Sequence, residues 1–413
     1  MPYNLLSKAL WNHLIASILS PLGSFLSLFV ATDKIRFPKF FIWIFITFFG
    51  YCSIVLPSGS GDIVRYIEFF KRCTEQEMDF HELWFSQIYY DGGNIEGYSR
   101  ILSWIVAQIT SDYHIMTMLF ASVFGFFYAQ ILYQILYAKT LAWRDRLLLL
   151  FMAMTQIGFW SWQTVDFYTA AVIFIYGAIM LYNNRNKRLL STLIIASTPF
   201  FHASFLYITI GWFLLLLLRN IAQKIPLEIL WALLFLSTLF IFFPPTALTG
   251  IVSMVMGGDN YYTRTYTFMN ESSETGGIFY TSIIFFLRLF FLIWVAANQR
   301  KLGLFGKQTT YRLILLSIFA VNIFSGIPTA RRIVSMFMVL LIVYIAMIKK
   351  REQPLKATPL HILTPIIFLY LTLTYAFHYT DMLSLITGPL FAPFIIGNGV
   401  PMGGLYEWFI QKG

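Results

Sequence analysis

The sequence predicts an all-α membrane protein: a polytopic transmembrane helical bundle of about 12 spans, with re-entrant or interfacial helices on its outer face. Hydrophobic residues make up 58% of the 413 positions, whereas Asp, Glu, Lys and Arg together make up only 12%. A soluble protein carries about a quarter of its residues as charged side chains. The apolar runs are continuous and not alternating, which favours helices over the strands of a membrane barrel.

Twelve apolar runs approach the roughly 20 residues that a helix needs to cross a bilayer. They centre on residues 13–31, 38–56, 115–138, 147–162, 167–182, 189–201, 204–218, 227–244, 278–298, 313–327, 333–348 and 360–377. The two runs beside His202 are short, which predicts tilted or broken helices or a re-entrant hairpin. The apolar stretch 101–110 is too short to span and predicts a re-entrant or interfacial helix. No repeat or linker divides the chain, so residues 1–413 are expected to form a single integral membrane domain.

Basic residues are distributed unequally between the two sets of connections, and this predicts the orientation. Nineteen of the 29 lysines and arginines, but only four of the 19 acidic residues, fall in one set, which is therefore predicted to be cytoplasmic. The net charge of +10 thus reports topology and gives no support for binding nucleic acid. Three long segments remain on the outer side: residues 57–114, 245–277 and the C-terminal tail 378–413. Any chemistry is expected on that face.

The two cysteines and six histidines point to neither a redox centre nor a metal site. Cys52 and Cys73 both lie near the predicted outer face, where a disulfide is chemically allowed, with two free thiols as the alternative. The histidines are scattered, and no pair of aspartates has a two-residue spacing. We therefore predict no metal, and the absence of a Gly-rich phosphate loop predicts no nucleotide cofactor.

The first outer segment holds the densest group of candidate functional residues. A Gly/Ser turn leads into a predicted helix that begins at Asp62, where the carboxylate could also act as an ordinary N-cap. Asp62 and Tyr66 are four residues apart and share a helix face with Arg65. A carboxylate, a guanidinium and a phenol presented together suit a sugar or phosphate ligand. Glu96 follows in the same segment, with a solvated loop as its alternative interpretation.

Three further candidates lie at or within the predicted bilayer, where ionisable groups need a partner or water. Asp166 falls at the outer end of a span, after tryptophans that are typical of an interfacial belt. His202 lies beside the break between two short runs and is either a hydrogen-bonding residue or a catalytic one. Arg288 lies about ten residues inside a span, beyond easy snorkelling, and should face a polar cavity or an acidic partner.

Late arginines on the outer side go against the orientation rule and so need an explanation. Arg331 and Arg332 precede the span at 333–348, and Arg264 lies among tyrosines. A guanidinium binds phosphate bidentately, and tyrosines stack on sugar rings. A diphosphate at the membrane surface is the natural partner, with lipid headgroup contact as the alternative.

The order of these pieces resembles the EpsG family of exopolysaccharide polymerases, which is related to the Wzy polymerases of O-antigen and capsule. The matching pieces are G-D-x-x-R-Y at residues 61–66, E-G-Y at 96–98, F-W at 159–160, F-H-A-S at 201–204, the tyrosine-rich loop 259–266 and the arginines at 331–332. The specificity lies in their succession over most of the chain. One position departs from the family pattern, because Val165 and Asp166 stand where the family usually shows an arginine.

The resemblance implies a glycosyltransferase that joins oligosaccharide repeat units carried on undecaprenyl diphosphate, at the periplasmic face of a bacterial inner membrane. Asp62 or His202 would then activate the acceptor hydroxyl. The residues expected to contact the substrate are Arg65, Tyr66, Glu96, Asp166, Arg264, Arg288, Arg331 and Arg332. Besides the lipid-linked oligosaccharide and the bilayer, a chain-length regulator is a further expected partner.

Two other classes of protein remain open at this stage. A multispanning lipid-linked glycosyltransferase also places an early acidic residue in its first outer loop, and it would add one sugar. A transporter or flippase for lipid-linked sugars would carry internal repeats with matched broken helices.

Overall fold

The computed structural model describes residues 37–53, 62–75, 78–83, 97–183, 185–241, 278–304, 308–325, 328–348 and 357–379, with a few positions between 15 and 25. Every regular element within these ranges is a helix, and no strand occurs in them. The predicted all-α fold class is therefore confirmed for this part of the chain. The predicted segment 245–277, residues 380–413 of the predicted tail 378–413, and most of the first run lie outside the described residues.

The helices follow the predicted apolar runs closely. From the N-terminus they are α3 (Pro38–Tyr51), α4 (Asp62–Glu75), α6 (Tyr98–Ala107), α7 (Tyr113–Leu136), α8 (Trp143–Gln156), η1 (Phe159–Gln163), α9 (Val165–Asn183), η2 (Arg185–Lys187) and α10 (Arg188–Ala196). They continue as α11 (Thr198–Phe201), α12 (Phe205–Leu217), α13 (Arg219–Ala222), α14 (Leu227–Thr238), η3 (Leu239–Ile241), α17 (Ile278–Asn298), α18 (Thr309–Ile323), α19 (Pro328–Met347) and α20 (Leu360–Tyr379). Each predicted run from 38–56 onward coincides with one of them.

Three of these helices are long and apolar enough to cross a membrane, namely Tyr113–Leu136, Val165–Tyr182 and Thr329–Met347. Seven further helical stretches are apolar, and the part of each whose side chains the structure describes is 10–17 residues long. A helix rises about 1.5 Å per residue, so a 14-residue helix reaches only about two thirds of the way across a hydrocarbon core of about 30 Å. The helices establish a membrane-embedded bundle, while the full number of spans stays a prediction.

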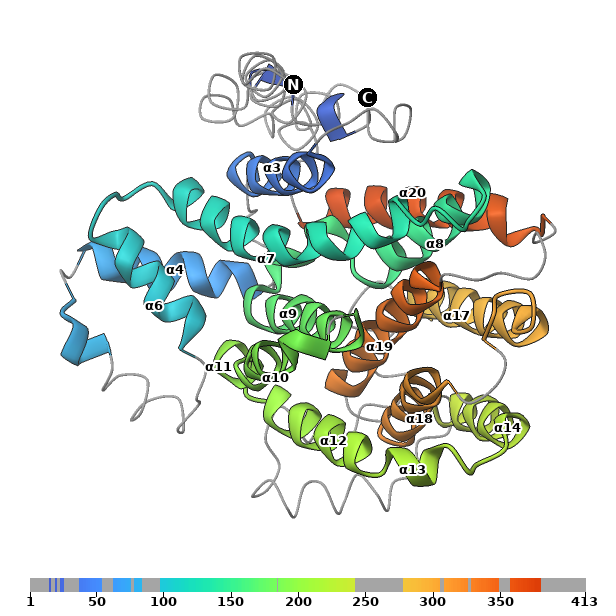
Figure 1. Ribbon diagram of the computed structural model, residues 1–413. Coiled ribbons are helices and arrows are strands. Elements are labelled where there is room, and N and C mark those ends of the chain that lie inside the picture. Colours follow the sequence, from blue (N-terminus) through green and yellow to red (C-terminus); the bar gives the residue numbers. More distant parts are fainter. Residues whose placement is uncertain are drawn as a thin grey trace, which may run out of the picture.

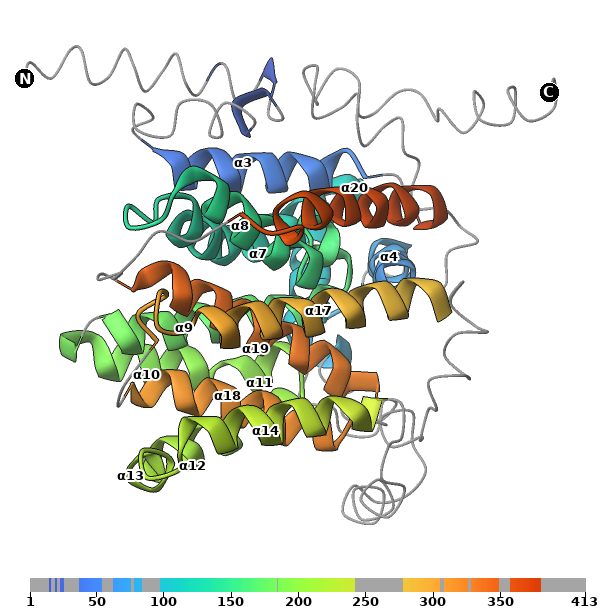
Figure 2. The same ribbon diagram turned by 90° about the vertical axis from the view of Figure 1, so that its right-hand side faces the viewer.

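The long helices run side by side, and two short elements lie across their opposite ends. Figure 2 shows α13 at one end, where the sequence predicts cytoplasm, and α4 end-on at the other, where it predicts the outer face. The helix α4 is amphipathic: it buries Ile63, Ile67 and Phe70 and exposes Arg65 and Glu68. This pattern is typical of a helix that lies on a membrane protein and not through the membrane.

A small unit forms where α4 packs against α6 (Figure 1). Cys73, Met78 and Leu83 make a separate hydrophobic cluster, which contacts Trp104 of α6. The indole of Trp104 donates a hydrogen bond of 2.7 Å to the carbonyl oxygen of Met78. Both Cys73 and Cys52 are buried free thiols, so the structure shows the alternative to a disulfide.

The most extensive helix pairing among the described residues joins α3 to α7, and glycines allow the two helices to approach closely. A Cβ atom on Gly50 would lie 2.3 Å from Cβ of Ala121 and 2.8 Å from the carbonyl oxygen of Thr117. On Gly125 it would lie 3.0 Å from Cβ of Ile46. Small residues allow such close approach between membrane helices.

Two short helical hairpins determine where the candidate site lies. In the first, α8 ends at Gln156 because Ile157 and Gly158 are both extended, and η1 then leads the chain into α9. In the second, Pro199 interrupts the helix between α10 and α11, because proline lacks an N–H donor and restricts the residue before it. His202 is extended at φ −152° and ψ 125° and separates α11 from α12. The predicted break beside His202 is therefore present.

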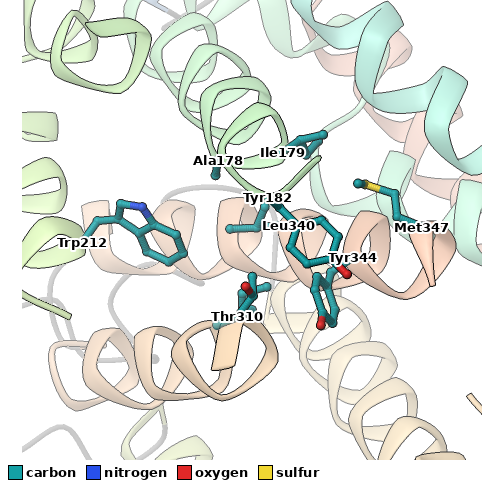
Figure 3. Close-up of a pocket in the computed structure, with 9 residues that line it drawn as sticks. Ala178, Ile179, Tyr182, Trp212, Thr310, Leu340, Tyr344 and Met347 are labelled. Atoms are coloured by element: carbon teal, nitrogen blue, oxygen red, sulfur yellow. The ribbon is translucent and has the colours of Figure 1, made fainter. Parts of the chain in front are cut away.

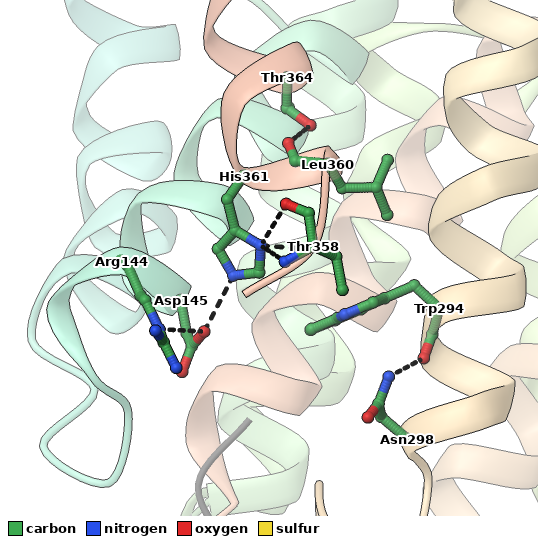
Figure 4. A network of polar contacts seen from close by, with 8 residues as sticks. All are labelled: Arg144, Asp145, Trp294, Asn298, Thr358, Leu360, His361 and Thr364. Atoms are coloured by element: carbon green, nitrogen blue, oxygen red, sulfur yellow. Dashed lines mark hydrogen bonds and ion pairs between the residues drawn. The ribbon is translucent and has the colours of Figure 1, made fainter. Parts of the chain in front are cut away.

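A buried contact between a histidine and an aspartate connects α8 with α20 (Figure 4). Nε2 of His361 lies 3.0 Å from Oδ1 of Asp145, and both side chains are almost fully buried. Nδ1 of the same ring lies 3.1 Å from the hydroxyl of Thr358. The pair joins residues 216 positions apart, so it fixes the last described helix against the middle of the chain.

Candidate functional site

The centre of the candidate site is Asp166, which is 4% exposed and lies in the first turn of α9. Its Oδ2 accepts a hydrogen bond from the hydroxyl of Tyr66 on α4. The same oxygen accepts a second hydrogen bond, of 2.9 Å, from Ser99 on α6. The N-terminal end of a helix also stabilises negative charge. Two predicted site residues, Tyr66 and Asp166, are thus in direct contact although 100 positions separate them.

The N-terminus of α6 is held against the second hairpin. The N–H group of Gly97 donates a hydrogen bond of 3.2 Å to the carbonyl oxygen of Phe200. A Cβ atom on Gly97 would lie 2.8 Å from the ring of Phe200, so the approach suits glycine. Next to it, the rings of Tyr98 and Phe201 lie 4.7 Å apart. These contacts bring α4, α6, α9 and α11 to one junction (Figure 1).

A cation near this junction was not among the predicted site residues. Arg100 lies on α6, and burial lowers the pKa of its guanidinium, while the nearby Tyr66 and Asp166 raise it. Arg65 and Arg72 of α4 lower this pKa further because they repel a third positive charge. The sequence signal for Arg100 was its place four residues after Glu96, at the start of an apolar stretch.

His202 packs against Phe167, the residue that follows Asp166. Its side chain is 9% exposed, and its ring packs edge-on against Phe167 at 5.2 Å between centroids. The backbone N–H of Ser204 donates to Nδ1 of His202 at 3.3 Å, and the Ser204 hydroxyl lies 2.9 Å from the same nitrogen. Because Nδ1 accepts, the proton of the neutral ring lies on Nε2. In this tautomer the Nε2–H group of His202 is a hydrogen-bond donor.

The arginine pair on α19 divides between two sides of the helix. The guanidinium of Arg332 is exposed and lies 5.8 Å from the centre of the Phe167 ring. Arg331 is half-buried, and its Nε donates a hydrogen bond of 3.3 Å to the carbonyl oxygen of Ser325. Successive helix residues differ in direction by about 100°. Arg332 therefore shares Phe167 with His202, whereas Arg331 faces Ser325.

Arg288 forms a second polar centre together with α8 and α19. Its guanidinium donates hydrogen bonds to the side chains of Gln156 and Ser335. The hydroxyl of Ser335 in turn donates to the carbonyl oxygen of Arg331 at 3.4 Å. The sequence predicted a polar cavity or an acidic partner for Arg288, and these two contacts are with neutral polar groups.

The remaining candidates are less completely placed. Asp62 begins α4, but its side chain is outside the described residues, as are Glu96 and Arg264 altogether. Arg65 is exposed on α4. The structure thus brings Tyr66 into contact with Asp166, with Arg100 near both, and places His202 and Arg332 against Phe167, the next residue of α9. Within the described ranges, no group of three or more His, Cys, Asp or Glu residues could hold a metal ion.

Two cavities lie between the long helices. One is lined by residues of α9, α12, α18 and α19, including Trp212, Tyr182 and Tyr344 (Figure 3). The other lies between α14, α17, α18 and α19 and is lined by Arg288 and Asn322 among apolar side chains. The first cavity has a mostly apolar and aromatic lining with polar groups from Tyr182, Tyr344 and Thr310, whereas the exposed lining of the second is almost entirely apolar. The second contains a charged residue that the sequence had marked.

The fold and the site define a membrane-embedded helical protein with cations and a buried carboxylate gathered where short hairpins end. A sequence model of the EpsG family matches residues 39–388. The chain belongs to the EpsG family, a family of Wzy-like polysaccharide polymerases. No curated protein and no solved structure matches the chain. The family resemblance seen in the ordered motifs is therefore confirmed.

Proposed function

We propose that the protein is a glycosyltransferase that polymerises oligosaccharide repeat units carried on undecaprenyl diphosphate, at the periplasmic face of a bacterial inner membrane. The observation that carries the proposal is that Arg332 and His202 both pack against Phe167, the residue that follows the buried Asp166 on α9. Membership of the EpsG family supports the same reaction. A lipid-linked diphosphate needs cations at the membrane surface, and Arg332 supplies one of them.

The reaction joins an acceptor hydroxyl to the anomeric carbon of the growing chain. A bond forms from the hydroxyl oxygen to that carbon, the bond to the carrier diphosphate breaks, and the hydroxyl proton passes to a base. Negative charge develops on the leaving diphosphate, where guanidinium groups stabilise it. Arg332 and Arg100 take this role in the proposal, with Arg65 and Arg264 as the further cations that the sequence suggested.

Burial decides how the acidic residues divide their roles. Asp166 accepts two hydrogen bonds and is almost inaccessible, so it positions Tyr66 and Ser99 and does not take a proton from substrate. Asp62 lies one helical turn before Tyr66 on α4 and is the proposed base. His202, with its proton on Nε2, is the proposed donor to a phosphate or sugar oxygen. A chain-length regulator is the proposed protein partner.

The test uses the purified full-length chain in nanodiscs with a lipid-linked repeat unit. A ladder of products supports the polymerase, addition of a single sugar supports a lipid-linked transferase, and unchanged substrate supports a transporter. We expect Asp62→Asn and Arg332→Ala to shorten or abolish the ladder. The matched control is Arg219→Ala, an exposed arginine on α13 at the opposite end of the bundle. If Asp62→Asn and Arg332→Ala both keep the full ladder, the site assignment is wrong.

A further inference from the structure

Arg288 faces the interior of the bundle from the middle of α17. One side of this helix exposes Phe286, Phe290 and Ile293, whereas Phe291 on the other side is fully buried. Successive helix residues differ in direction by about 100°, so Arg288 lies on the same side as Phe291. It is about ten residues, and therefore about 15 Å, from the first residue of α17.

The guanidinium of Arg288 connects two segments that carry candidate site residues. Its Nε donates to the side-chain oxygen of Gln156 at 2.5 Å, and its Nη2 donates to the hydroxyl of Ser335 at 2.5 Å. Both partners are almost fully buried. From Gln156, the last residue of α8, the chain continues through η1 to Asp166. Ser335 lies about one turn after Arg332 on α19. One side chain therefore joins the hairpin α8–η1–α9 to α19.

The position of this cation has a physical reason in the end of α8. The last carbonyl groups of a helix have no partner within the helix and carry partial negative charge. Since α8 ends inside a membrane-embedded bundle, water is scarce around these groups. The hydroxyl of Tyr128 on α7 donates to the carbonyl oxygen of Ile157, and the guanidinium of Arg288 adds a positive charge at the same helix end. Arg288 thus favours the early end of α8 on which the hairpin depends.

We propose that Arg288 is a positioning residue for the transfer reaction. Through Gln156 and Ser335 it holds the hairpin against α19 and so sets where Asp166 and Arg332 lie relative to each other, without itself contacting the substrate. This role replaces the substrate contact that the sequence suggested for Arg288, and it rests on the proposed function. A rigid guanidinium directs two N–H groups to two partners at once, whereas lysine offers a single charged group on a flexible stem.

The first test separates the turnover number from substrate binding, with the full chain in nanodiscs and a lipid-linked repeat unit. Arg288→Lys and Arg288→Gln should both lower kcat by about ten- to 100-fold and change KM by less than about twofold, because a displacement of about 1 Å costs about this much in rate. Gln156→Leu and Ser335→Ala should lower kcat in the same way but by less. The matched control is Ser317→Ala on α18, since this buried hydroxyl bonds only to the backbone of its own helix.

Combining variants distinguishes positioning from the other two roles of an intramembrane arginine. If Arg288 acts through Gln156, adding Gln156→Leu to Arg288→Gln should cause no further loss. An arginine that binds the substrate would instead raise KM, add its effect to that of Gln156→Leu, and keep more activity in Arg288→Lys than in Arg288→Gln. An arginine that only anchors α17 would lower the thermal midpoint and leave kcat of the folded protein unchanged. Either pattern would overturn the inference.

A distance measurement keeps this inference separate from the proposed reaction. Spin labels are placed at Thr164→Cys, where η1 ends, and at Thr329→Cys in the first turn of α19; both positions are half-buried, and the native cysteines are buried. We expect Arg288→Gln to shift or broaden the distance distribution between the labels in electron–electron double resonance. If the wild type forms no ladder yet this change occurs, the proposed reaction fails and the positioning role stands. An unchanged distribution in Arg288→Gln would show that the inference is wrong.

Discussion

Asp166 illustrates how a single buried carboxylate can organise a site without reacting. Its partners Tyr66 and Ser99 come from two other helices, so the carboxylate ties three helices together. The sequence marked Asp166 and Tyr66 because ionisable and phenolic groups are costly near a bilayer. It could not show that they touch, because nothing local connects residues 100 positions apart.

Tyr66→Phe removes one of the two hydroxyls that Asp166 accepts from. A hydrogen bond to a charged group contributes about 1.5–3 kcal/mol, so we expect a lower midpoint of thermal unfolding and a clear loss of polymer. The matched control is Tyr207→Phe on α12, because the side chain of Tyr207 is 55% exposed. Equal stability and activity of both variants would contradict the role given to Tyr66.

His202 can be tested through the position of its proton. Glutamine can place an N–H group close to that of Nε2, whereas alanine supplies none. We expect His202→Gln to keep a substantial part of the polymerase activity and His202→Ala to lose about 100-fold, which is the low end for the loss of one oxyanion-type hydrogen-bond donor. If His202 were instead a general base, both variants would be equally inactive in the ladder assay.

At the scale of elements, the apolar runs predicted the helices because continuous hydrophobicity is a strong signal in a membrane protein. They did not predict the early end of α8 at Gln156, since the next residues remain apolar and only Gly158 marks the turn. The contact between Asp145 and His361 was likewise beyond the sequence, because a scattered histidine shows no partner. The neighbours of Arg100 could not be predicted either, because Tyr66 and Asp166 are distant from it in the sequence.

The pairing of α3 with α7 can be tested at one glycine. A methyl group on Gly50 meets the backbone of Thr117 and Cβ of Ala121, neither of which can rotate away. Overpacking of this kind costs about 1–3 kcal/mol, so Gly50→Ala should lower the unfolding midpoint. Gly211→Ala on α12 has open space around the new Cβ and should be neutral, or stabilising by up to about 1 kcal/mol. The comparison fails if the two variants melt alike.

At the scale of the whole molecule, the distribution of basic residues predicts which end of the bundle faces the cytoplasm. Elements from predicted opposite sides, α4 and α13, do lie at opposite ends of the long helices (Figure 2).

Cysteine labelling in intact cells tests this direction. Glu68→Cys on the exposed face of α4 should react with a membrane-impermeant maleimide, and Arg219→Cys on α13 should react only after permeabilisation. The native background is low because Cys52 and Cys73 are buried. Burial also raises the pKa of Cys73 to about 11, so at pH 7 its thiol stays protonated and unreactive. Reversed labelling would invert the proposed topology.

The shortness of the hairpins has a consequence for the competition between sugar and water. The helices α7 and α8 are joined by a short connection, and α7 is 24 residues long whereas α8 is 14 residues long. At about 1.5 Å per residue, α8 ends roughly 15 Å before it reaches the level of the outer end of α7. Asp166, which follows η1, therefore lies deeper along the bundle than the first turn of α7, and Tyr66 of α4 and Ser99 of α6 cover it. Bulk water reaches an anomeric carbon bound at this depth less readily than one bound at the surface. The depth of the hairpin tips thus favours glycosidic transfer over hydrolysis, and lengthening α8 by a helical turn should raise the fraction of released, unlinked sugar.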